Sequence, residues 1–174
     1  IFSNLLVSCN SYQHLLKSNN AALKFEKAKE YYNKKEFNKA LLLFDDIMPF
    51  YRSSEKIEEI KYKSAFCNLA MNNYIAAASG FKEVFELYPY DTFAEPSLYN
   101  FAYCLYRESP AVELDQSYTK DAIDAFLLYT NRFTDDEKVE LCNKYIDELT
   151  EKLEEKDIRM AKQYYKLEEG QIIN

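Results

Sequence analysis

The sequence contains no tryptophan, a single histidine and only 2 glycines. So little glycine, beside 4 prolines, argues against an all-β fold, which needs a tight turn about every ten residues. It also argues against a glycine-rich phosphate-binding loop. Because His14 stands close to the amino terminus, no Ser-His-Asp or Cys-His arrangement is expected. We therefore expect neither an enzyme nor a cofactor.

Long apolar runs and excess positive charge are missing as well. No stretch approaches the ~20 apolar residues that a membrane-spanning helix requires. The formal net charge of −7 argues against a nucleic-acid partner. Aromatic residues, in contrast, are abundant, with 16 tyrosines and 12 phenylalanines. They supply enough apolar area for a core or for a binding surface.

A repeated pattern runs through the chain. Each unit has a leading alanine, then a second alanine that is followed four residues later by phenylalanine: Ala28, Ala40 and Phe44; Ala65, Ala77 and Phe81; Ala102, Ala122 and Phe126. The leading alanines stand 37 residues apart, twice, and the two alanines of the first two units stand 12 apart. This spacing is that of the tetratricopeptide repeat (TPR), a helical hairpin.

Helix packing explains why these residue types are needed. A small residue on each helix lets the two helices approach closely, and the phenylalanine fills the space between hairpins. A hairpin buries its apolar face only by stacking on a neighbour. We therefore predict an all-α TPR solenoid of about three and a half repeats at residues 21–54, 58–91 and 95–136, with the start of a further repeat at 154–174. The alternative is a non-repetitive helical bundle.

Two segments depart from the repeat. The third unit has eight extra residues, which we place in a loop at residues 109–116, because Pro110 ends one helix and Asp115 or Ser117 starts the next. Residues 137–156 carry apolar side chains at spacings of three and four, which predicts a long amphipathic helix. No glycine or proline separates it from the helix that Ile158 opens, so we expect the two to be continuous.

The four cysteines have different roles in our interpretation. Cys67 and Cys104 occupy equivalent repeat positions and Cys142 lies on an apolar stripe, so we expect core residues and no metal site. Leu6-Val7-Ser8-Cys9 is similar to the lipobox of bacterial lipoproteins, which implies cleavage after Ser8 and a lipid on Cys9. Residues 1–8 would be the rest of a signal peptide and residues 9–20 a tether. The alternative is an ordinary apolar N-terminal strand or helix end.

Together these features resemble the BamD family, the TPR lipoproteins of the outer-membrane β-barrel assembly (BAM) machine, in its Bacteroidota version. The matching segments are Cys9 with Tyr12-Gln13 and Leu15 to Ser18; Lys24 to Tyr32; Ala102 to Cys104; Glu108 to Gln116; Ala122 to Ala125; Cys142 to Lys144; and Ile146 to Leu149. The resemblance implies a scaffold on the periplasmic face of the outer membrane that receives unfolded barrel precursors. It also implies docking on a BamA-like barrel protein through later repeats. We expect both chain ends to be truncated and those repeats to be missing here.

The TPR register also predicts which side chains face the concave groove. They are Phe25, Lys29, Tyr32 and Asn33 in the first unit; Tyr62, Phe66, Leu69 and Ala70 in the second; and Tyr99, Tyr103, Tyr106 and Arg107 in the third. An aromatic groove with two cationic points suits a peptide that carries aromatic side chains and a carboxylate. We expect about half of these rings to pack between helices instead.

Two other functions remain open. One is a glycan-binding outer-membrane lipoprotein of the SusD type, whose rings would stack on sugars; the missing tryptophan and the lack of long loop insertions argue against it. The other is a generic periplasmic TPR adaptor.

Overall fold

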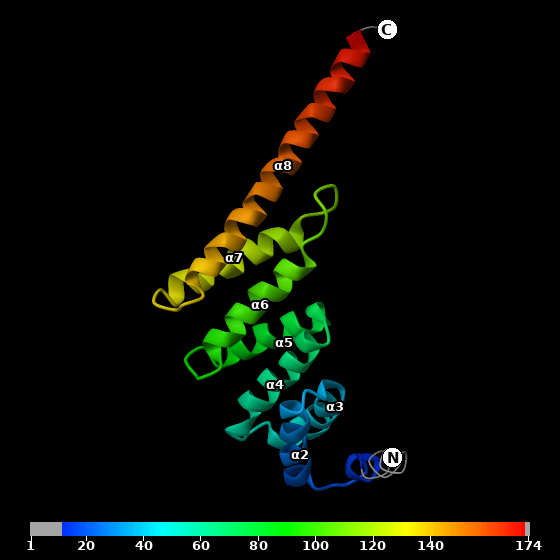
Figure 1. Ribbon diagram of the computed structural model, residues 1–174, viewed down its shortest axis with the longest axis vertical. Coiled ribbons are helices and arrows are strands. Elements are labelled where there is room, and N and C mark those ends of the chain that lie inside the picture. The colour runs from blue at the N-terminus through cyan, green and yellow to red at the C-terminus, as the bar shows by residue number, and fades with distance from the viewer. Residues whose placement is uncertain (1–11, 173–174) are drawn as a thin grey trace, which may run out of the picture. The chain divides into compact units, whose positions relative to one another are not determined.

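The structure, a computed structural model, describes residues 12–172, with side chains as far as residue 168. Within that part every regular element is helical, which confirms the predicted all-α class (Figure 1). The chain divides into two compact units, Ile1–Ala94 (unit 1) and Glu95–Asn174 (unit 2).

Unit 1 consists of successive helices joined by short turns. After a helical segment at residues 12–16 come α2 (Ala21–Asn33), α3 (Phe37–Ile47), the 3₁₀ turn η1 (Met48–Tyr51), α4 (Lys56–Ala70) and α5 (Tyr74–Leu87). The side chain of Asn20 accepts a hydrogen bond from the Leu23 amide at 3.0 Å, which caps the start of α2. Helix α3 packs on α2 and α4, and α4 also packs on α5.

The two helical hairpins of unit 1 end their first helix in the same way. Lys35 after α2 and Asn72 after α4 adopt left-handed backbone conformations, with φ of 60° and 62°. The amide of the following residue then reaches back five residues at 2.9 Å, from Glu36 to the Tyr31 carbonyl and from Asn73 to the Asn68 carbonyl. This is the hydrogen bond that closes a helix at a left-handed residue. The two turns lie 37 residues apart, the interval of the leading alanines.

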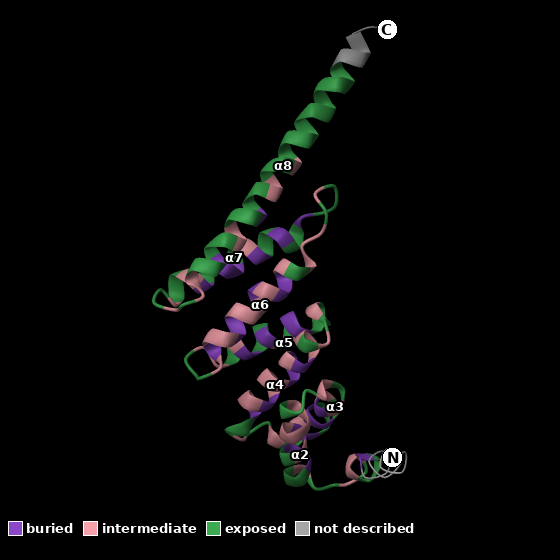
Figure 2. Cartoon of the chain, viewed as in Figure 1, coloured by how far each residue is buried: buried purple, intermediate pink, exposed green. Residues whose placement is uncertain are grey.

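The repeated alanines and phenylalanines lie in the core, on the faces that the helices turn toward one another (Figure 2). The leading and second alanines of all three units are at most 3% exposed, and Phe44, Phe81 and Phe126 are fully buried. Helices α4 and α5 approach closely at Gly80, where an added Cβ would lie 2.8 Å from the Cβ of Ala65. Only glycine fits at this crossing.

Unit 2 consists of α6 (Ala94–Glu108, whose first residue belongs to unit 1), α7 (Ser117–Arg132) and α8 (Val139–Ile172). The loop at residues 109–116 separates α6 from α7 where the sequence predicts it. Helix α8 is continuous over 34 residues, also as predicted. Its first half packs on α7, whereas residues 157–168 are exposed throughout (Figure 2).

Residues 12–16 differ from the expected tether. They form a helical segment, and Tyr12 is only 8% exposed in the core cluster of α2 and α3. Its hydroxyl donates a hydrogen bond to the Lys39 carbonyl at 3.0 Å. Part of the segment that we expected to be a tether is therefore packed on the helices of unit 1, because the tyrosine ring fills a space beside Tyr31.

Candidate functional site

Three tyrosines line one face of α6 in unit 2. Tyr99, Tyr103 and Tyr106 follow one another at intervals of four and three residues, which places them in a row along the helix. The Tyr99 and Tyr103 rings are stacked with centroids 6.4 Å apart and planes at 8°, and Tyr106 continues the stack 6.2 Å from Tyr103. All three side chains are half-buried. We call this row the tyrosine ladder.

Helix α8 adds a fourth ring to the ladder. The ring of Tyr145 lies 4.5 Å from that of Tyr106 and 6.3 Å from that of Tyr103, and 5.3 Å from the buried Phe126. One turn further along α8, Glu148 accepts hydrogen bonds from the Tyr106 hydroxyl at 3.0 Å to each carboxylate oxygen. Burial, followed by this bond, raises the pKa of Tyr106 to about 12. The ring is therefore a neutral hydrogen-bond donor at physiological pH.

Cations flank the ladder at its two ends. The exposed Arg107 donates a hydrogen bond from Nη1 to the Tyr103 hydroxyl at 3.0 Å. The Lys138 ammonium lies 5.5 Å from the centre of the Tyr99 ring and 2.9 Å from a carboxylate oxygen of Glu95. Burial raises the pKa of Tyr99 to about 12. The ladder thus has a guanidinium group and an ammonium group beside its rings.

Unit 1 has an aromatic cluster of its own, formed by predicted groove residues. The Tyr32 ring lies 5.6 Å from Phe66, which lies 6.4 Å from Tyr62. Tyr62 is in turn stacked on Phe93 at 4.6 Å, and Lys63 lies over Tyr32 with its ammonium 4.3 Å from the ring centre. Burial raises the pKa of the Tyr32 hydroxyl well above its ordinary value. These rings are half-buried, and much of their area is used in contacts with one another.

Phe25, a predicted groove residue, lies in the core. Its side chain is 2% exposed, with its ring 5.6 Å from Tyr51. The ammonium groups of Lys29 and Lys56 each lie 5.0 Å from the centre of the same ring. The repeat register identifies the face of α2 on which Phe25 lies, but the η1 turn covers that position. Lys29 remains at the surface as a cationic point above a buried ring.

Sequence reasoning missed the contributions of Tyr145, Glu148 and Lys138. They lie outside the repeat positions from which the groove was predicted. Tyr145 and Glu148 are three residues apart on α8, at the edge of the apolar stripe that contains Cys142 and Leu149. This spacing, which places both side chains on the same helix face, was the signal in the sequence that could have identified them. Which neighbour this edge of α8 contacts depends on the packing of α8 in unit 2.

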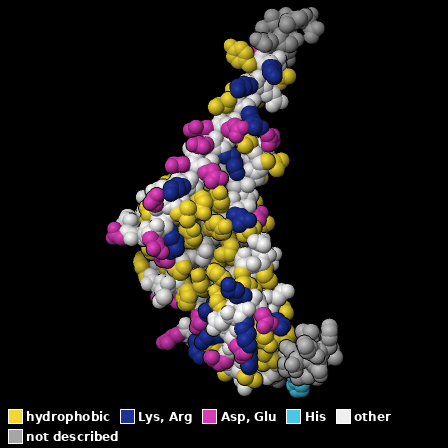
Figure 3. Space-filling model, viewed as in Figure 1, with side chains coloured by type: hydrophobic (Ala, Val, Ile, Leu, Met, Phe, Trp, Pro, Cys, Tyr) yellow, Lys and Arg dark blue, Asp and Glu magenta, His cyan; other side chains and the backbone are white. Residues whose placement is uncertain are grey.

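The hydrophobic side chains over α6 gather into one patch on the face shown in Figure 3. A half-buried ring can cover an aromatic or aliphatic side chain of a ligand, while a hydroxyl or guanidinium group orients the ligand's polar groups. Arg107 is the group suited to a carboxylate. The ladder therefore offers aromatic faces, hydroxyl groups and a guanidinium group that can contact the aromatic, aliphatic and carboxylate groups of a ligand.

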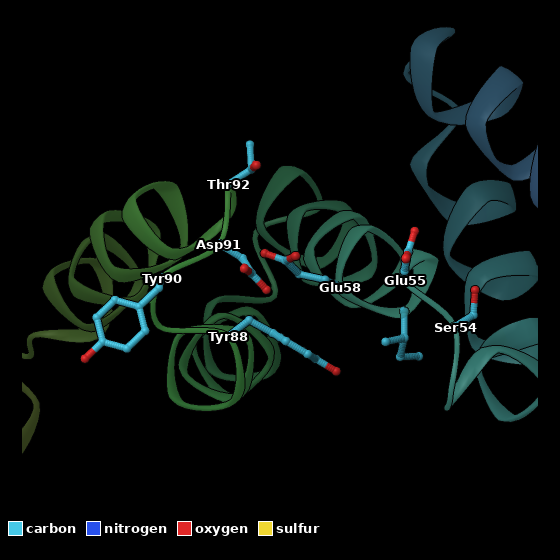
Figure 4. A pocket seen from close by; sticks show the side chains of 8 residues that line it. Ser54, Glu55, Glu58, Tyr88, Tyr90, Asp91 and Thr92 are labelled. Atoms are coloured by element: carbon cyan, nitrogen blue, oxygen red, sulfur yellow. The ribbon is translucent and has the colours of Figure 1, made fainter.

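A cavity of about 410 Å³ lies elsewhere in unit 1, between the loop before α4 and the loop after α5 (Figure 4). Glu58 and Asp91 point toward one another in it, and Tyr88 and Glu55 lie at its edge. Burial raises the pKa of Glu58, and the Asp91 charge adds to that shift, whereas the Phe93 amide, which donates to Glu58 at 3.2 Å, lowers it. The cavity contains none of the predicted site residues.

Three of the four cysteines lie in the core. Cys67, Cys104 and Cys142 are free thiols and fully buried, as predicted. Burial raises their pKa values to about 12, 12 and 11, so they are unreactive at neutral pH. Cys9 lies outside the described residues. None of the described helices is long and apolar enough to span a membrane.

Comparison with known proteins gives no assignment. No family model matches the chain, and no curated protein matches its sequence.

Proposed function

We propose that the chain is a TPR solenoid tethered by a lipid on Cys9 to the periplasmic face of the outer membrane. Three features support a repeat architecture: the leading alanines are buried at an interval of 37 residues, the turns at Lys35 and Asn72 have the same geometry, and the equivalent phenylalanines are buried. Leu6-Val7-Ser8-Cys9 supports the lipid anchor.

In this proposal the protein is a scaffold subunit of the BAM machine that binds unfolded barrel precursors. The observation that carries the proposal is the tyrosine ladder, half-buried and adjacent to the exposed Arg107. Extended segments of barrel strands alternate apolar and polar side chains and are rich in aromatic residues at the membrane interface. Stacked rings on a helix face suit such side chains, and the guanidinium suits a carboxylate. A BamA-like protein is the expected structural partner.

The direct test is a pull-down of the tagged full-length protein from envelope extracts. A BamA-like barrel protein in the eluate supports the assembly scaffold. The same experiment with Tyr99→Ala/Tyr103→Ala separates the two kinds of partner, because this variant should lose bound precursors and keep BamA. If neither BamA nor barrel precursors are recovered with the wild-type protein, the proposal is wrong.

A SusD-like glycan-binding protein is the second candidate. It is favoured by one observation, the row of half-buried tyrosine rings with the nearly parallel planes of Tyr99 and Tyr103, because aromatic rings can stack on sugar rings. A SusC-like transporter in the eluate, together with oligosaccharide binding that the Tyr99→Ala/Tyr103→Ala variant loses, would favour this function. Recovery of other periplasmic proteins alone would favour a generic adaptor.

The anchor has its own test. Radiolabelled palmitate should enter the full-length wild-type protein in cells, and Cys9→Ala should abolish the label and release the protein into the periplasm. Cys67→Ala is the matched control, because this buried thiol is not available for acylation. Membrane retention of Cys9→Ala without label would contradict the proposed anchor.

A further inference from the structure

The helical segment at residues 12–16 is held against helices α2 and α3 of unit 1. The Tyr12 hydroxyl donates to the Lys39 carbonyl of α3 at 3.0 Å, and its ring meets that of Tyr31 on α2 edge-on at 5.4 Å. The buried Lys24 ammonium donates to the Leu16 carbonyl at 2.9 Å. Residues 12–16 are thus held against both α2 and α3.

This attachment limits the distance between Cys9 and helices α2 and α3. Three peptide units join Cys9 to Tyr12, and a fully extended chain covers roughly 11 Å over that length. If a lipid on Cys9 enters the membrane, the surface around Tyr12 lies within about one Debye length of the headgroups. The inference rests on the proposed anchor at this point.

The charge of the same region is opposite to that of the rest of the chain. Residues 12–40 contain seven lysines and three glutamates, whereas the other residues contain 15 basic and 26 acidic side chains. Lys17 and Lys35 are exposed and form no ion pair with any residue from 12 to 168. The ammonium of Lys39 lies 5.8 Å from the centre of the Tyr12 ring. Figure 3 shows dark blue side chains over α2 with magenta ones among them.

We propose that the basic end of unit 1, which is the surface beside the buried Tyr12 that carries Lys17, Lys35 and Lys39, lies directly on anionic phospholipid headgroups. Basic residues beside a lipid anchor are attracted to anionic lipid, and a second signal of this kind makes anchoring stable. The Tyr12 attachment makes the contact possible, because it brings the lysines close to the lipid. The anchor then also fixes the orientation of unit 1 at the membrane surface.

The test attaches the chain to vesicles by chemistry, so that it does not depend on lipid modification in cells. Maleimide-bearing phospholipid couples to Cys9, because Cys67, Cys104 and Cys142 are buried. Vesicles of phosphatidylcholine, with or without phosphatidylglycerol, are then treated with a water-soluble acetylating reagent, and each lysine is followed by mass spectrometry. With phosphatidylglycerol, the acetylation of Lys17 and Lys35 should slow by at least about three-fold, and high salt should remove the effect.

Lys82 on α5 and Lys144 on α8 are internal controls, because they lie outside the basic end of unit 1, and their acetylation should be the same on both vesicles. Equal rates for Lys17 and Lys35 on the two kinds of vesicle would overturn the proposal. Tyr12→Ala should restore their acetylation while the circular-dichroism spectrum stays helical. Lys39 should be protected together with Lys17 and Lys35. Lys17→Glu/Lys35→Glu leaves the core untouched and should remove this protection of Lys39, so it carries the test if Tyr12→Ala does not fold. A negative result here with palmitate labelling at Cys9 would refute the headgroup contact and leave the anchor intact.

Discussion

At the scale of single residues, alanine sets how closely the helices approach. Ala65 and Ala102 are nearly or fully buried, and the Cβ of Ala65 faces Gly80. Ala65→Leu and Ala102→Leu should each reduce the free energy of unfolding by ~1–3 kcal/mol or more, because the larger side chain has no space. The matched control is Ala111→Leu, an exposed loop position that should be nearly neutral. Thermal melts that show the loop variant to be equally damaging would contradict the assigned packing.

Glu58 gives a prediction of pH dependence. Its pKa in the folded protein is raised above 4.5 mainly by burial. Between the ordinary and the raised pKa the folded state holds more protons than the unfolded state, so stability falls as pH rises through this interval. Glu58→Gln should abolish that loss while retaining an acceptor for the Phe93 amide. In thermal melts from about pH 4 to about pH 8, the stability of the variant relative to the wild type should increase as pH rises. A constant difference would be inconsistent with the raised pKa.

The sequence is a good guide to the buried residues and a weaker one to the exposed ones. Because small and aromatic residues recur at fixed spacing, the buried alanines, phenylalanines and cysteines could be predicted. Register alone identifies the face on which Phe25 lies, but not that Tyr51 packs against its ring. Tyr145 was missed for a related reason, since its contact with Tyr106 joins helices far apart in the sequence.

At the scale of elements, hydrogen bonds from lysines of α8 hold the loop at residues 109–116 in place. The Lys152 ammonium donates to the Ser109 hydroxyl at 2.8 Å and to the Pro110 carbonyl at 3.3 Å. Lys156 donates to the Leu114 carbonyl one turn later. Lys152→Met keeps an unbranched side chain but loses these bonds, so amide hydrogen exchange in the loop should become faster with little change in melting temperature.

The control for this prediction is Lys144→Met. It removes an exposed ion pair with Glu140 on the same helix and should leave exchange in the loop unchanged. Identical exchange in the loop for Lys152→Met and wild type would show that the loop is held by other contacts. These include the hydrogen bond that the side-chain amide of Gln116 donates to the Ala111 carbonyl at 2.8 Å.

Element boundaries followed from local signals where such signals exist. Pro110 indicates the end of α6, and the unbroken periodicity after residue 137 predicts the continuous α8. The helical segment at residues 12–16 was missed because its polar composition resembles a tether. It is held by the long-range contacts of Tyr12 with Tyr31 and Lys39, which local periodicity does not contain.

At the scale of the whole molecule, the two units have aromatic clusters of different character. In unit 1 the rings of Tyr32, Tyr62 and Phe66 contact one another and other phenylalanines. In unit 2 the tyrosine ladder is bordered by the exposed Arg107. If the ladder binds clients, its loss should affect binding more than stability, and the opposite should hold for a core ring such as Phe81.

The most direct test of this account is fluorescence anisotropy titration of an extended peptide with aromatic residues at alternating positions and a free terminal carboxylate. Tyr99→Ala/Tyr103→Ala should weaken binding by ~2 kcal/mol, roughly thirty-fold in Kd. Phe81→Ala, which empties a core position, should lower stability by ~3–5 kcal/mol and leave binding by the folded fraction unchanged. If the tyrosine variant melts far below the wild type yet binds the peptide normally when folded, the ladder is packing between helices and not a binding site.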